Sequence, residues 1–535
     1  MRTNRWIIAV LLVGAPLVAA AQETVDLDVV TRIRDEGLNH SQVMETARVL
    51  ADEIGARLTN SPAMRRAEEW TRAKLTEWGL SNTHFEPFEF GRGWSFSNVD
   101  VRMVKPVEAV LYALPKAWTP ATGGVVRGGV VRASVESEED LEKLHGKVAG
   151  KIVFLDKPRE LKPPESSQFA RYTEQALESL EQYPISAARR PEFRERFQKQ
   201  ARLAEKIKTF LKAEGAMASV EISARDGGII TVAGIRSYKP GEDPGVPGLV
   251  MVAEHYNRIA RLIEHDVAVE LEILVDARFY ESDTKPNNVI AEIPGGDRKG
   301  EVVMAGAHLD SWHAGTGATD NGAGCVVVME AARILKAIGV KPRRSIRVAL
   351  WSSEEQGLNG SRAYVAEHFG ARAEPTDPEQ KALPDWARRQ RGPLQLKPEH
   401  AKLSAYYNVD NGAGKIRGIY AQENAAVRPI FDAWLKPFTD LGAGAVTLRD
   451  TRGTDHLSFD AVGLPGFQFV QDELDYDSRT HHSQMDVYDR LQAADLMQAS
   501  VVLAAVLYDT AMRDALMPRK PLPREERPAA PARQP

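Results

Sequence analysis

Between Asn287 and Tyr508, short apolar segments alternate with segments of helical pattern, and this alternation restricts the fold more than any other feature of the sequence. Strand-like segments such as NVIAEIPG, EVVMAGAHLD and RVALWSS are separated by helical ones such as NGAGCVVVMEAARILKAIG. Strands with helical crossover connections predict a mostly parallel mixed sheet with helices on both faces. The sequence therefore predicts an α/β domain, which we place at residues 284–515.

Ionisable side chains stand where the predicted strands of this α/β domain end. In chain order they are His308, Asp310, Asp320, Glu354, Glu355, Asp410, His481 and His482. In an open α/β sheet, functional groups gather at the carboxyl ends of the strands. Nitrogen and oxygen donors of these kinds suit zinc better than manganese or cobalt. The pattern predicts a zinc site, in which one carboxylate can bridge two ions.

Glu354 and Glu355 lie side by side directly after an apolar strand. Adjacent carboxylates repel each other, and their desolvation is costly unless something compensates it. Both are explained if one binds a cation and the other takes a proton from water. Each candidate alone has a simpler interpretation, since a glutamate pair is usually solvated and Asp320 could cap the next helix. Their coincidence at successive strand ends favours a catalytic metal site.

The rest of the chain divides into further units. Residues 22–87 have the amphipathic pattern of capped helices. Residues 88–283 contain short β-type segments separated by Gly and Pro, which indicates a separate β-rich domain. Within it, residues 158–214 are strongly charged and predict a helical insertion. Residues 516–535 are rich in Pro and charge, and this composition predicts disorder.

The first 21 residues have the features of a secretory signal peptide. Arg2 and Arg5 precede an apolar run from Trp6 to Val18, and cleavage is expected after Ala21. An uncleaved membrane anchor is the alternative, which the short apolar run disfavours. No later segment is expected to be long and apolar enough to span a bilayer, so we predict a secreted or periplasmic protein without a membrane segment after cleavage.

The charge balance and the single cysteine exclude several classes of protein. The formal net charge of −5 is small for 535 residues and gives no sign of a nucleic-acid partner or an anionic membrane surface. Cys325 is the only cysteine, so the core must hold without an intrachain disulfide.

The motifs around the candidate residues resemble those of metallopeptidase family 28, the co-catalytic di-zinc exopeptidases. The matching stretches within residues 287–508 are AGAHLDSW, GATDNGAG, LWSSEEQGLNGSRAY, DNGAG and HHSQMD. HLDSW, LWSSEEQG and HHS together are most similar to the carboxypeptidase Q branch of a family that also contains leucyl-type aminopeptidases. The β-rich segment, above all GKVAGKIVFLD, resembles the protease-associated domain that many members carry as an insertion.

The resemblance implies two zinc ions per chain and a ligand set for each. His308 and Asp410 would bind one Zn²⁺, Glu355 and His482 would bind the other, and Asp320 would bridge them. The second histidine of the pair is chosen because the family pattern places Ser or Thr directly after the ligand and Asp four residues on.

The resemblance also implies roles in catalysis and substrate binding. Glu354 would be the general base, acting on a water that bridges the two ions. Asp310 would orient His308 by accepting the hydrogen of its other ring nitrogen. Asp455 and His456, in the segment GTDHLSFDAVGLPG, would line the substrate pocket.

These features together predict a zinc-dependent exopeptidase that hydrolyses peptide bonds near chain ends. It would act as an aminopeptidase or as a dipeptidase of the carboxypeptidase Q type, on peptides or dipeptides, and the resemblance also implies a homodimer. Two alternatives use the same fold: a glutaminyl cyclase, which performs an acyl transfer with one zinc, and an inactive binding protein. The β-rich insertion argues against the cyclase, and the complete ligand set argues against the inactive scaffold.

Several residues near the predicted site have no assigned role. His313 stands where related sequences tend to have Asp, close enough to affect specificity. Arg449, Arg452 and Arg479 could bind a substrate carboxylate, or they could be ordinary surface residues. The charged insertion at 158–214 lies outside the family pattern and could shape substrate access, an oligomer contact, or neither.

Overall fold

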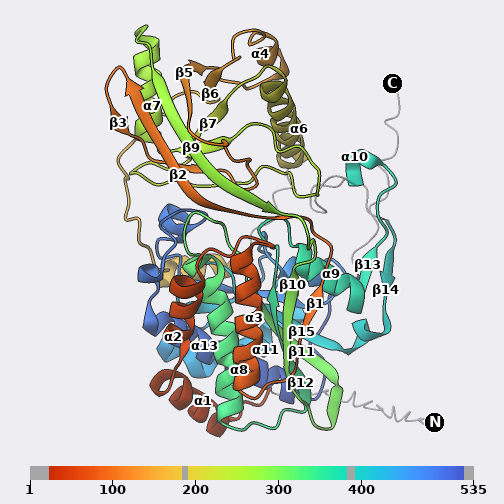
Figure 1. The fold of residues 1–535 in the computed structure, drawn as a ribbon. Helices are drawn as coiled ribbons and strands as arrows, with labels where there is room; N and C mark the ends of the chain where they lie inside the picture. Colours follow the sequence, from red (N-terminus) through yellow and green to blue (C-terminus); the bar gives the residue numbers. More distant parts are fainter. Residues whose placement is uncertain (1–22, 184–190, 382–391, 523–535) are drawn as a thin grey trace, which may run out of the picture.

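Two eight-stranded sheets organise the structure, a computed structural model that describes residues 23–183, 191–381 and 392–522. One sheet belongs to a lower body with most of the helices, and the other belongs to an upper, β-rich body (Figure 1). The predicted signal peptide at residues 1–21 lies outside the described residues.

The lower sheet has the mixed topology that the alternating pattern predicts. Its strands, in spatial order, are β1 (Ser81–Pro87), β10 (Asn287–Ile293), β12 (Arg344–Trp351), β11 (Arg298–His308), β15 (Leu403–Asn408), β18 (Gly466–Gln471), β16 (Ile416–Tyr420) and β17 (Ala445–Thr447). The central strands β12, β11, β15 and β18 run parallel, so their carboxyl ends meet at one edge. Antiparallel pairs flank them on both sides, β10 with β12 and β16 with β18.

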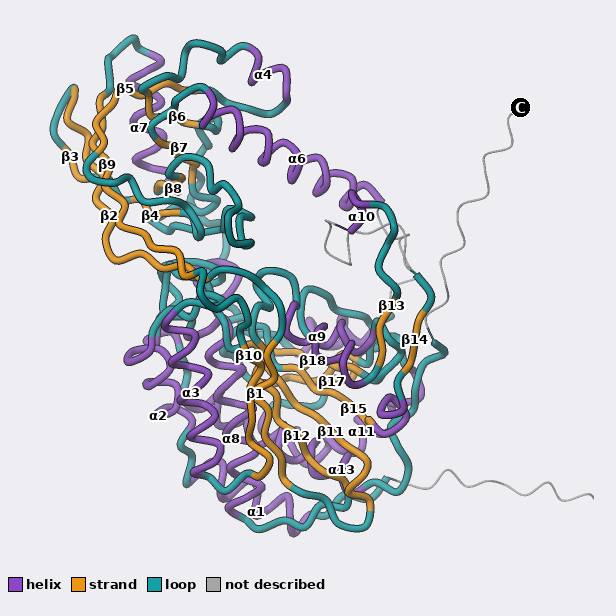
Figure 2. The backbone as a smooth tube through the Cα atoms, turned by 45° about the vertical axis from the view of Figure 1, so that its right-hand side comes forward, coloured by secondary structure: helices purple, strands orange, loops and turns teal. Residues whose placement is uncertain are grey.

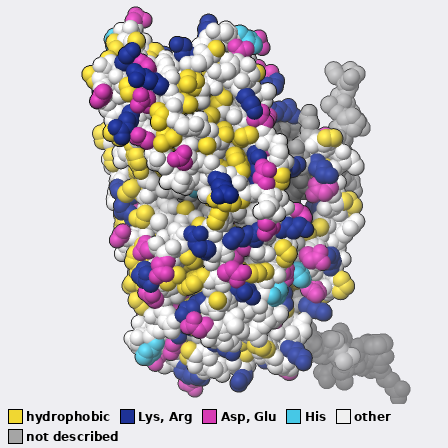
Figure 3. Space-filling view, viewed as in Figure 1, with side chains coloured by type: hydrophobic (Ala, Val, Ile, Leu, Met, Phe, Trp, Pro, Cys, Tyr) yellow, Lys and Arg dark blue, Asp and Glu magenta, His cyan; other side chains and the backbone are white. Residues whose placement is uncertain are grey.

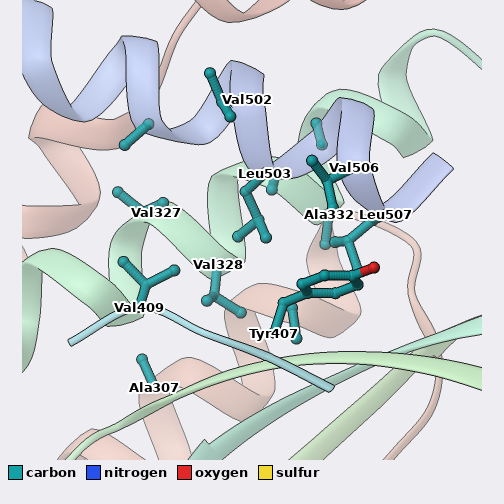
Figure 4. Close-up of a cluster of buried hydrophobic side chains, with 14 of the residues drawn as sticks. Ala307, Val327, Val328, Ala332, Tyr407, Val409, Val502, Leu503, Val506 and Leu507 are labelled. Atoms are coloured by element: carbon teal, nitrogen blue, oxygen red, sulfur yellow. The ribbon is translucent and has the colours of Figure 1, made fainter. Parts of the chain in front are cut away.

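Helices cover both faces of this sheet, which confirms the predicted α/β fold class. On one face lie α1 (Leu27–Asn39), α2 (Val43–Arg48), α3 (Pro62–Glu77), α8 (Ala323–Ala337), α11 (Arg428–Leu435) and α13 (Ala493–Met512). On the other face lie α9 (Asn359–His368) and α12 (His456–Asp460). In Figure 4, Val327 and Val328 of α8 lie between sheet residues such as Tyr407 and the α13 side chains Val502 and Leu503. Both helices are buried around most of their circumference and are rich in apolar residues because they lie between layers.

By its length and composition alone, helix α13 could cross a membrane. Of its most apolar 18-residue stretch, however, 89% is buried inside the structure. The expectation that no segment beyond the N-terminus has this character is therefore wrong. The helix packs against α1, α8 and α11. Its apolar surface serves the core of the lower body.

The N-terminal segment is helical only as far as residue 77. Ser61 caps α3, with its side chain accepting a hydrogen bond from Met64 N, as the pattern predicts. Residues 81–87 were predicted to continue the helical unit, and they instead form β1, which pairs antiparallel with β10. Gly79 has φ +79°, a left-handed conformation that ends the helix and turns the chain toward the sheet edge.

The β-rich body is inserted between β1 and β10. Its strands, in spatial order, are β3 (Ala109–Val110), β2 (Gly93–Lys105), β9 (Glu270–Tyr280), β5 (Val126–Arg132), β6 (Lys151–Phe154), β7 (Ala218–Ile222), β8 (Gly248–Met251) and β4 (Ala113–Pro115). With α7 (Ala253–Glu264) they enclose a separate hydrophobic core. The long strands β2 and β9 connect this body to the lower one (Figure 1).

The charged insertion contains α5 (Glu174–Glu181) and α6 (Pro191–Ala213), whose C-terminal end packs on the β-rich body while the rest of the helix extends away from it (Figure 2). Before α5, the chain returns to the lower body, where Ala170 pairs with Leu474 and Arg171 forms ion pairs with Asp472 and Asp495. The insertion is therefore only partly helical, and a stretch of it lies against the peptide chain that follows β18.

Smaller elements complete the described chain: α4 (Glu138–Glu142), α10 (Pro378–Lys381), and the short pair β13 (Gly370–Arg372) and β14 (Leu394–Leu396). On the face shown in Figure 3, basic and acidic side chains are intermixed over both bodies, in keeping with the small net charge.

Residues 516–522, the first part of the predicted disordered tail, are ordered in the structure. Met517 is 2% exposed and belongs to the core of the lower body. Arg519 donates hydrogen bonds to the main-chain oxygens of His400 and Leu403, and Lys520 pairs with Asp460. These anchors order residues 516–522 despite their proline-rich composition, and residues 523–535 lie outside the described part of the chain.

Candidate active site

The carboxyl ends of the central parallel strands bring the predicted site residues together. His308 is the last residue of β11, Glu354 and Glu355 follow β12, and Asp410 follows β15. Asp320 lies in the short turn Ala318–Gly322 that leads into α8, and its own backbone there is extended, with φ −128° and ψ 91°. The predicted residues thus lie far apart in the sequence and meet at one edge of the sheet. They come from the end of β11 and from the loops after β12, β15 and β18.

The carboxylate of Asp320 faces two separate groups of donor atoms. Its Oδ1 lies 3.4 Å from His308 Nε2, which also lies 3.3 Å from Asp410 Oδ1. Its Oδ2 lies 3.4 Å from His482 Nε2, which lies 3.0 Å from Glu355 Oε2. Ligands bound tetrahedrally at about 2.0–2.1 Å are separated by about 3.3–3.4 Å. The donor spacings therefore match those around two small cations that share one carboxylate.

Two carboxylate oxygens in this cluster are buried without a hydrogen-bond partner among the described residues. They are Asp320 Oδ2 and Glu355 Oε1. A buried charged oxygen left unpaired is costly, and binding of a cation would compensate both. Two candidate metal-binding groups share Asp320, one with His308 and Glu355 and one with His481 and His482. The residues present therefore fit a pair of metal ions.

The pKa values of the carboxyl groups in the cluster are shifted by burial and by the charges of their neighbours. Burial raises the pKa of Glu354 and of Glu355 well above the usual range of a carboxyl, and neighbouring carboxylates such as Asp410 add to the effect. Burial also acts to raise the pKa of Asp320, but the imidazoles of His308 and His482 outweigh it and lower that pKa. The site concentrates negative charge that positive groups must balance.

Asp310 has a different role from the predicted one. His308 Nδ1 donates to the main-chain oxygen of Asp310 at 2.9 Å, whereas the distance to the carboxylate Oδ1 is 3.7 Å, too long for a hydrogen bond. The carboxylate instead accepts from the main-chain nitrogens of Glu354, at 3.0 Å, and Glu355, at 3.3 Å. The hydroxyl of Thr59 also donates to it, at 3.1 Å. Asp310 thus orients the glutamate pair with its side chain and His308 with its backbone.

Asp486 holds the turn that carries Asp320. It accepts hydrogen bonds from Thr319 N at 2.5 Å, Thr319 Oγ1 at 2.8 Å and Asp320 N at 3.2 Å. Burial raises the pKa of Asp486 to about 7. In the sequence, Asp486 stands out only as the last residue of the HHSQMD motif. Nothing in that motif predicts its contact with residues 319–320.

Arg57 is a second structural residue of the site, and its sequence context does not single it out. It is fully buried, and its guanidinium donates to the main-chain oxygens of Leu309 and Gly317 at 2.7 Å and of Thr316 at 2.8 Å. It thereby joins the chain after β11 to the turn before Asp320. No motif in the N-terminal segment predicts a contact more than 250 positions away.

Asp455 and His456 are both fully buried, so neither side chain lines an open pocket as predicted. Both carboxylate oxygens of Asp455 lack a hydrogen-bond partner among the described residues, and burial raises its pKa to about 7. His456 Nε2 lies 3.2 Å from the main-chain oxygen of Thr451, and burial lowers its pKa to about 4. These two residues lie beneath the site, at the start of α12.

The arginines considered for substrate binding interact with other parts of the chain. Arg449 donates to the main-chain oxygens of Ser179 and Gln182, and Arg479 donates to the side chain of Gln168. Arg452 pairs with its neighbour Asp450.

His313 is likewise engaged in packing. Its Nε2 lies 2.7 Å from the main-chain oxygen of Pro115, and its ring lies edge-on to Trp94 and Phe96. Burial lowers its pKa to about 4, so the ring is neutral near pH 7. It joins the lower body to the β-rich body.

Comparison with known proteins identifies relatives over most of the chain. Residues 288–507 match the model of Peptidase family M28. Carboxypeptidase Q from Homo sapiens is 24% identical over 487 residues, which cover 90% of this chain and 88% of the relative. The Mus musculus protein of the same name is 26% identical with the same coverage.

Solved structures share the fold. A peptidase M28 precursor from Shewanella amazonensis superposes with a TM-score of 0.67 at 24% identity, covering 93% of this chain and 98% of that one. BSAP, a zinc aminopeptidase from Bacillus subtilis, gives a TM-score of 0.55 at 16% identity, covering 88% and 95%. The matched model confirms the predicted family for residues 288–507, which form a domain of peptidase family M28, and the solved structures show the same fold.

Proposed function

We propose that this protein is a zinc-dependent exopeptidase with two zinc ions in the site around Asp320. The observation that carries this proposal is the placement of the two oxygens of that carboxylate toward two different donor groups. The relatives named carboxypeptidase Q and the neighbour described as a zinc aminopeptidase support it. The N-terminal pattern of residues 1–21 supports export of the protein.

The ligand set follows from the donor groups. His308 and Asp410 would hold one zinc, Glu355 and His482 would hold the other, and Asp320 would be shared. Bound zinc supplies Lewis-acid chemistry, which lowers the pKa of water and polarises a carbonyl group.

Glu354 is the residue left to move a proton. It neighbours the ligand Glu355 and is 9% exposed, and the Asp310 carboxylate holds its main-chain N–H. Its carboxylate takes a proton from the attacking water and returns it to the nitrogen of the leaving amine. The amide bond of the substrate is thereby cleaved with no net change in the protonation of Glu354.

The charge of the site favours a substrate with a free amino terminus. Carboxylates surround the cluster, whereas Arg449, Arg452 and Arg479 interact with other parts of the chain. Two zinc ions would neutralise most of this charge, so the attraction for a protonated amine would come from the carboxylates that bind no ion. Both an aminopeptidase and a dipeptidase of the carboxypeptidase Q type recognise such a terminus.

A peptide panel analysed by mass spectrometry tests the proposal. Purified, zinc-loaded protein is incubated with dipeptides, longer free peptides, N-terminally acetylated peptides and peptides that begin with Gln. We expect chelator-sensitive release of residues from free amino termini only. Cleavage confined to dipeptides would place the protein with the carboxypeptidase Q type, and cyclisation of Gln without hydrolysis would overturn the peptidase proposal.

Variants of two glutamates sharpen the test. Glu354→Gln should keep both ions and lose turnover by about 10²- to 10⁴-fold, the range typical of a removed general base. Glu142→Gln, whose side chain is 79% exposed in the β-rich body, serves as the control and should retain full activity. Undiminished turnover of Glu354→Gln would exclude that residue as the general base.

A further inference from the structure

The peptide groups on both sides of His482 are held by the β-rich body. The main-chain oxygen of His481 accepts a hydrogen bond of 2.7 Å from Arg225 Nη1. The main-chain oxygen of His482 accepts one of 3.0 Å from Val232 N. Because these two peptide planes determine φ and ψ of His482, two residues of the inserted body restrain the backbone from which this imidazole projects.

His482 needs such restraint because its backbone is left-handed. Its φ is +59°, a conformation that is unfavourable for residues other than glycine and that they keep only where the surroundings enforce it. Relaxation to a common conformation would turn the imidazole away from Glu355 Oε2, which now lies 3.0 Å from its Nε2.

Arg225 also binds the chain that precedes the histidine pair. Its guanidinium also donates to the main-chain oxygens of Asp477, at 2.8 Å, and Arg479, at 3.1 Å. These carbonyl groups belong to the turn Tyr476–Thr480, which directly precedes the histidine pair. A cation there is favoured by the unpaired carbonyl groups at the end of a helical turn. Ion pairs of Arg225 with a carboxylate are absent among the described residues.

Two further contacts extend the restraint beyond the histidines. Ser483 forms an isolated β-bridge with Thr231. The side chain of Gln484 accepts from Ile230 N and donates to the main-chain oxygen of Gly228, both at 2.8 Å. Residues 481, 482 and 484 are therefore hydrogen-bonded to the segment 225–232 of the β-rich body, and Ser483 lies opposite Thr231.

The other half of the site is built differently. His308 is the end residue of β11, and Asp410 lies two positions beyond β15, so the sheet itself places both. Within the described part of the chain, segment 225–232 forms no hydrogen bond with the side chains of His308 and Asp410 or with the residues that flank them.

We propose that Arg225 is a positioning residue for one metal ion only, the one held by Glu355 and His482. The inserted body then sets the affinity of the second ion without contacting it. This inference rests on the proposed function, because it presumes that two ions bind.

Zinc titration of the whole protein against a chromophoric chelator tests the inference, with metal content measured by mass spectrometry. We expect Arg225→Gln to weaken one of two binding constants by about 10- to 100-fold, the range found when supporting residues around a metal site are removed, and to leave the other unchanged. Arg225→Lys should recover part of the loss. Gln484→Leu, which removes a neighbouring contact, should weaken the same constant to a smaller degree.

Arg519→Gln is the matched control. Arg519 also donates to main-chain oxygens, those of His400 and Leu403, and burial lowers its pKa as it does that of Arg225. Arg519 contacts the first residue of β15, whereas Asp410 follows the other end of that strand. Its substitution should leave both zinc constants unchanged, even if the melting temperature falls.

A double variant separates positioning from general destabilisation. His482→Ala should bind one ion, and adding Arg225→Gln should leave that remaining constant unchanged. Equal weakening of both constants in Arg225→Gln, or wild-type constants for both, would overturn the inference. Failure of the wild-type protein to bind two ions would instead overturn the proposed function, so the two failures are distinguishable.

Discussion

The Asp310 carboxylate accepts a 3.0 Å hydrogen bond from the main-chain nitrogen of Glu354 and so ties the end of β11 to the end of β12. The same side chain lies 3.7 Å from the His308 ring. The Asp310 carboxylate therefore positions the proposed base Glu354 and its neighbour Glu355 more directly than it positions the His308 ring.

Asp310→Asn should impair turnover more than zinc binding. The asparagine keeps one acceptor, but its amide group would face the nitrogen of Glu355 or the hydroxyl of Thr59, at a cost of about 1–3 kcal/mol for the unsatisfied buried group. We expect kcat to fall at least tenfold while KM and zinc content stay near wild type, because His308 remains bonded to the main-chain oxygen of residue 310. Asp276→Asn, on the exposed surface of β9, is the control. Loss of zinc with unchanged kcat per bound zinc would show that the carboxylate serves His308 after all.

Asp320→Ala should remove both ions, whereas single substitutions of the unshared ligands should remove one each. The reason is that, within the described part of the chain, Asp320 is the residue that presents one oxygen to each donor group. Metal content after gel filtration gives the measurement: near zero for Asp320→Ala, and one ion per chain for His308→Ala and for His482→Ala. Retention of one ion by Asp320→Ala would argue against a shared carboxylate.

The predictable part of this site is the part that strands deliver. His308, Glu354 and Asp410 follow apolar segments whose strand character is evident, so their meeting at one edge follows from the parallel order of the sheet. Arg57 and Arg225 could not be found in this way. They lie in irregular segments, and their partners are main-chain carbonyl groups far along the chain, which leave no mark in the residue types.

The fold was predictable to a similar degree and for similar reasons. The apolar segments of β10, β11 and β12 and the buried helix α8 have strong patterns. Strand β1 does not, because it is an edge strand with mostly half-exposed residues. Residues 516–522 have the composition of a disordered tail, and only the burial of Met517 and the contacts of Arg519 order them.

Asp509 should make stability fall as pH rises. It is buried in α13, and burial raises its pKa to about 8, above the usual value of 3.8. Between these two pH values the folded state holds a proton that the unfolded state has lost, so the free energy of unfolding decreases by up to about 1.4 kcal/mol per pH unit. Asp509→Asn removes this dependence. Melting curves from pH 4 to pH 8 should show a gain for the variant that grows with pH, and a constant difference would contradict the assignment.

Gly324→Ala should prevent correct packing of α8. A Cβ there would lie 2.1 Å from the main-chain oxygen of Val409 and 2.3 Å from Asn321 Oδ1, so the helix could not approach the strand that leads to Asp410. Overpacking of this kind costs typically 1–3 kcal/mol or more. We expect a lower melting temperature and loss of the ion that Asp410 would bind. Gly300→Ala, where a Cβ would meet nothing within 4 Å, is the control and should be neutral.

The β-rich body leaves and re-enters the lower sheet at adjacent points, since Pro87 and Asn287 are register partners in the β1–β10 pair. A deletion of the intervening residues would therefore shorten the chain to a simple hairpin and leave the lower sheet continuous. Such a shortened descendant would still inherit every proposed ligand and the base, yet the left-handed backbone of His482 would have lost both of its flanking anchors. The insertion is thus dispensable for the topology of the lower sheet, whereas the proposed position of His482 depends on it.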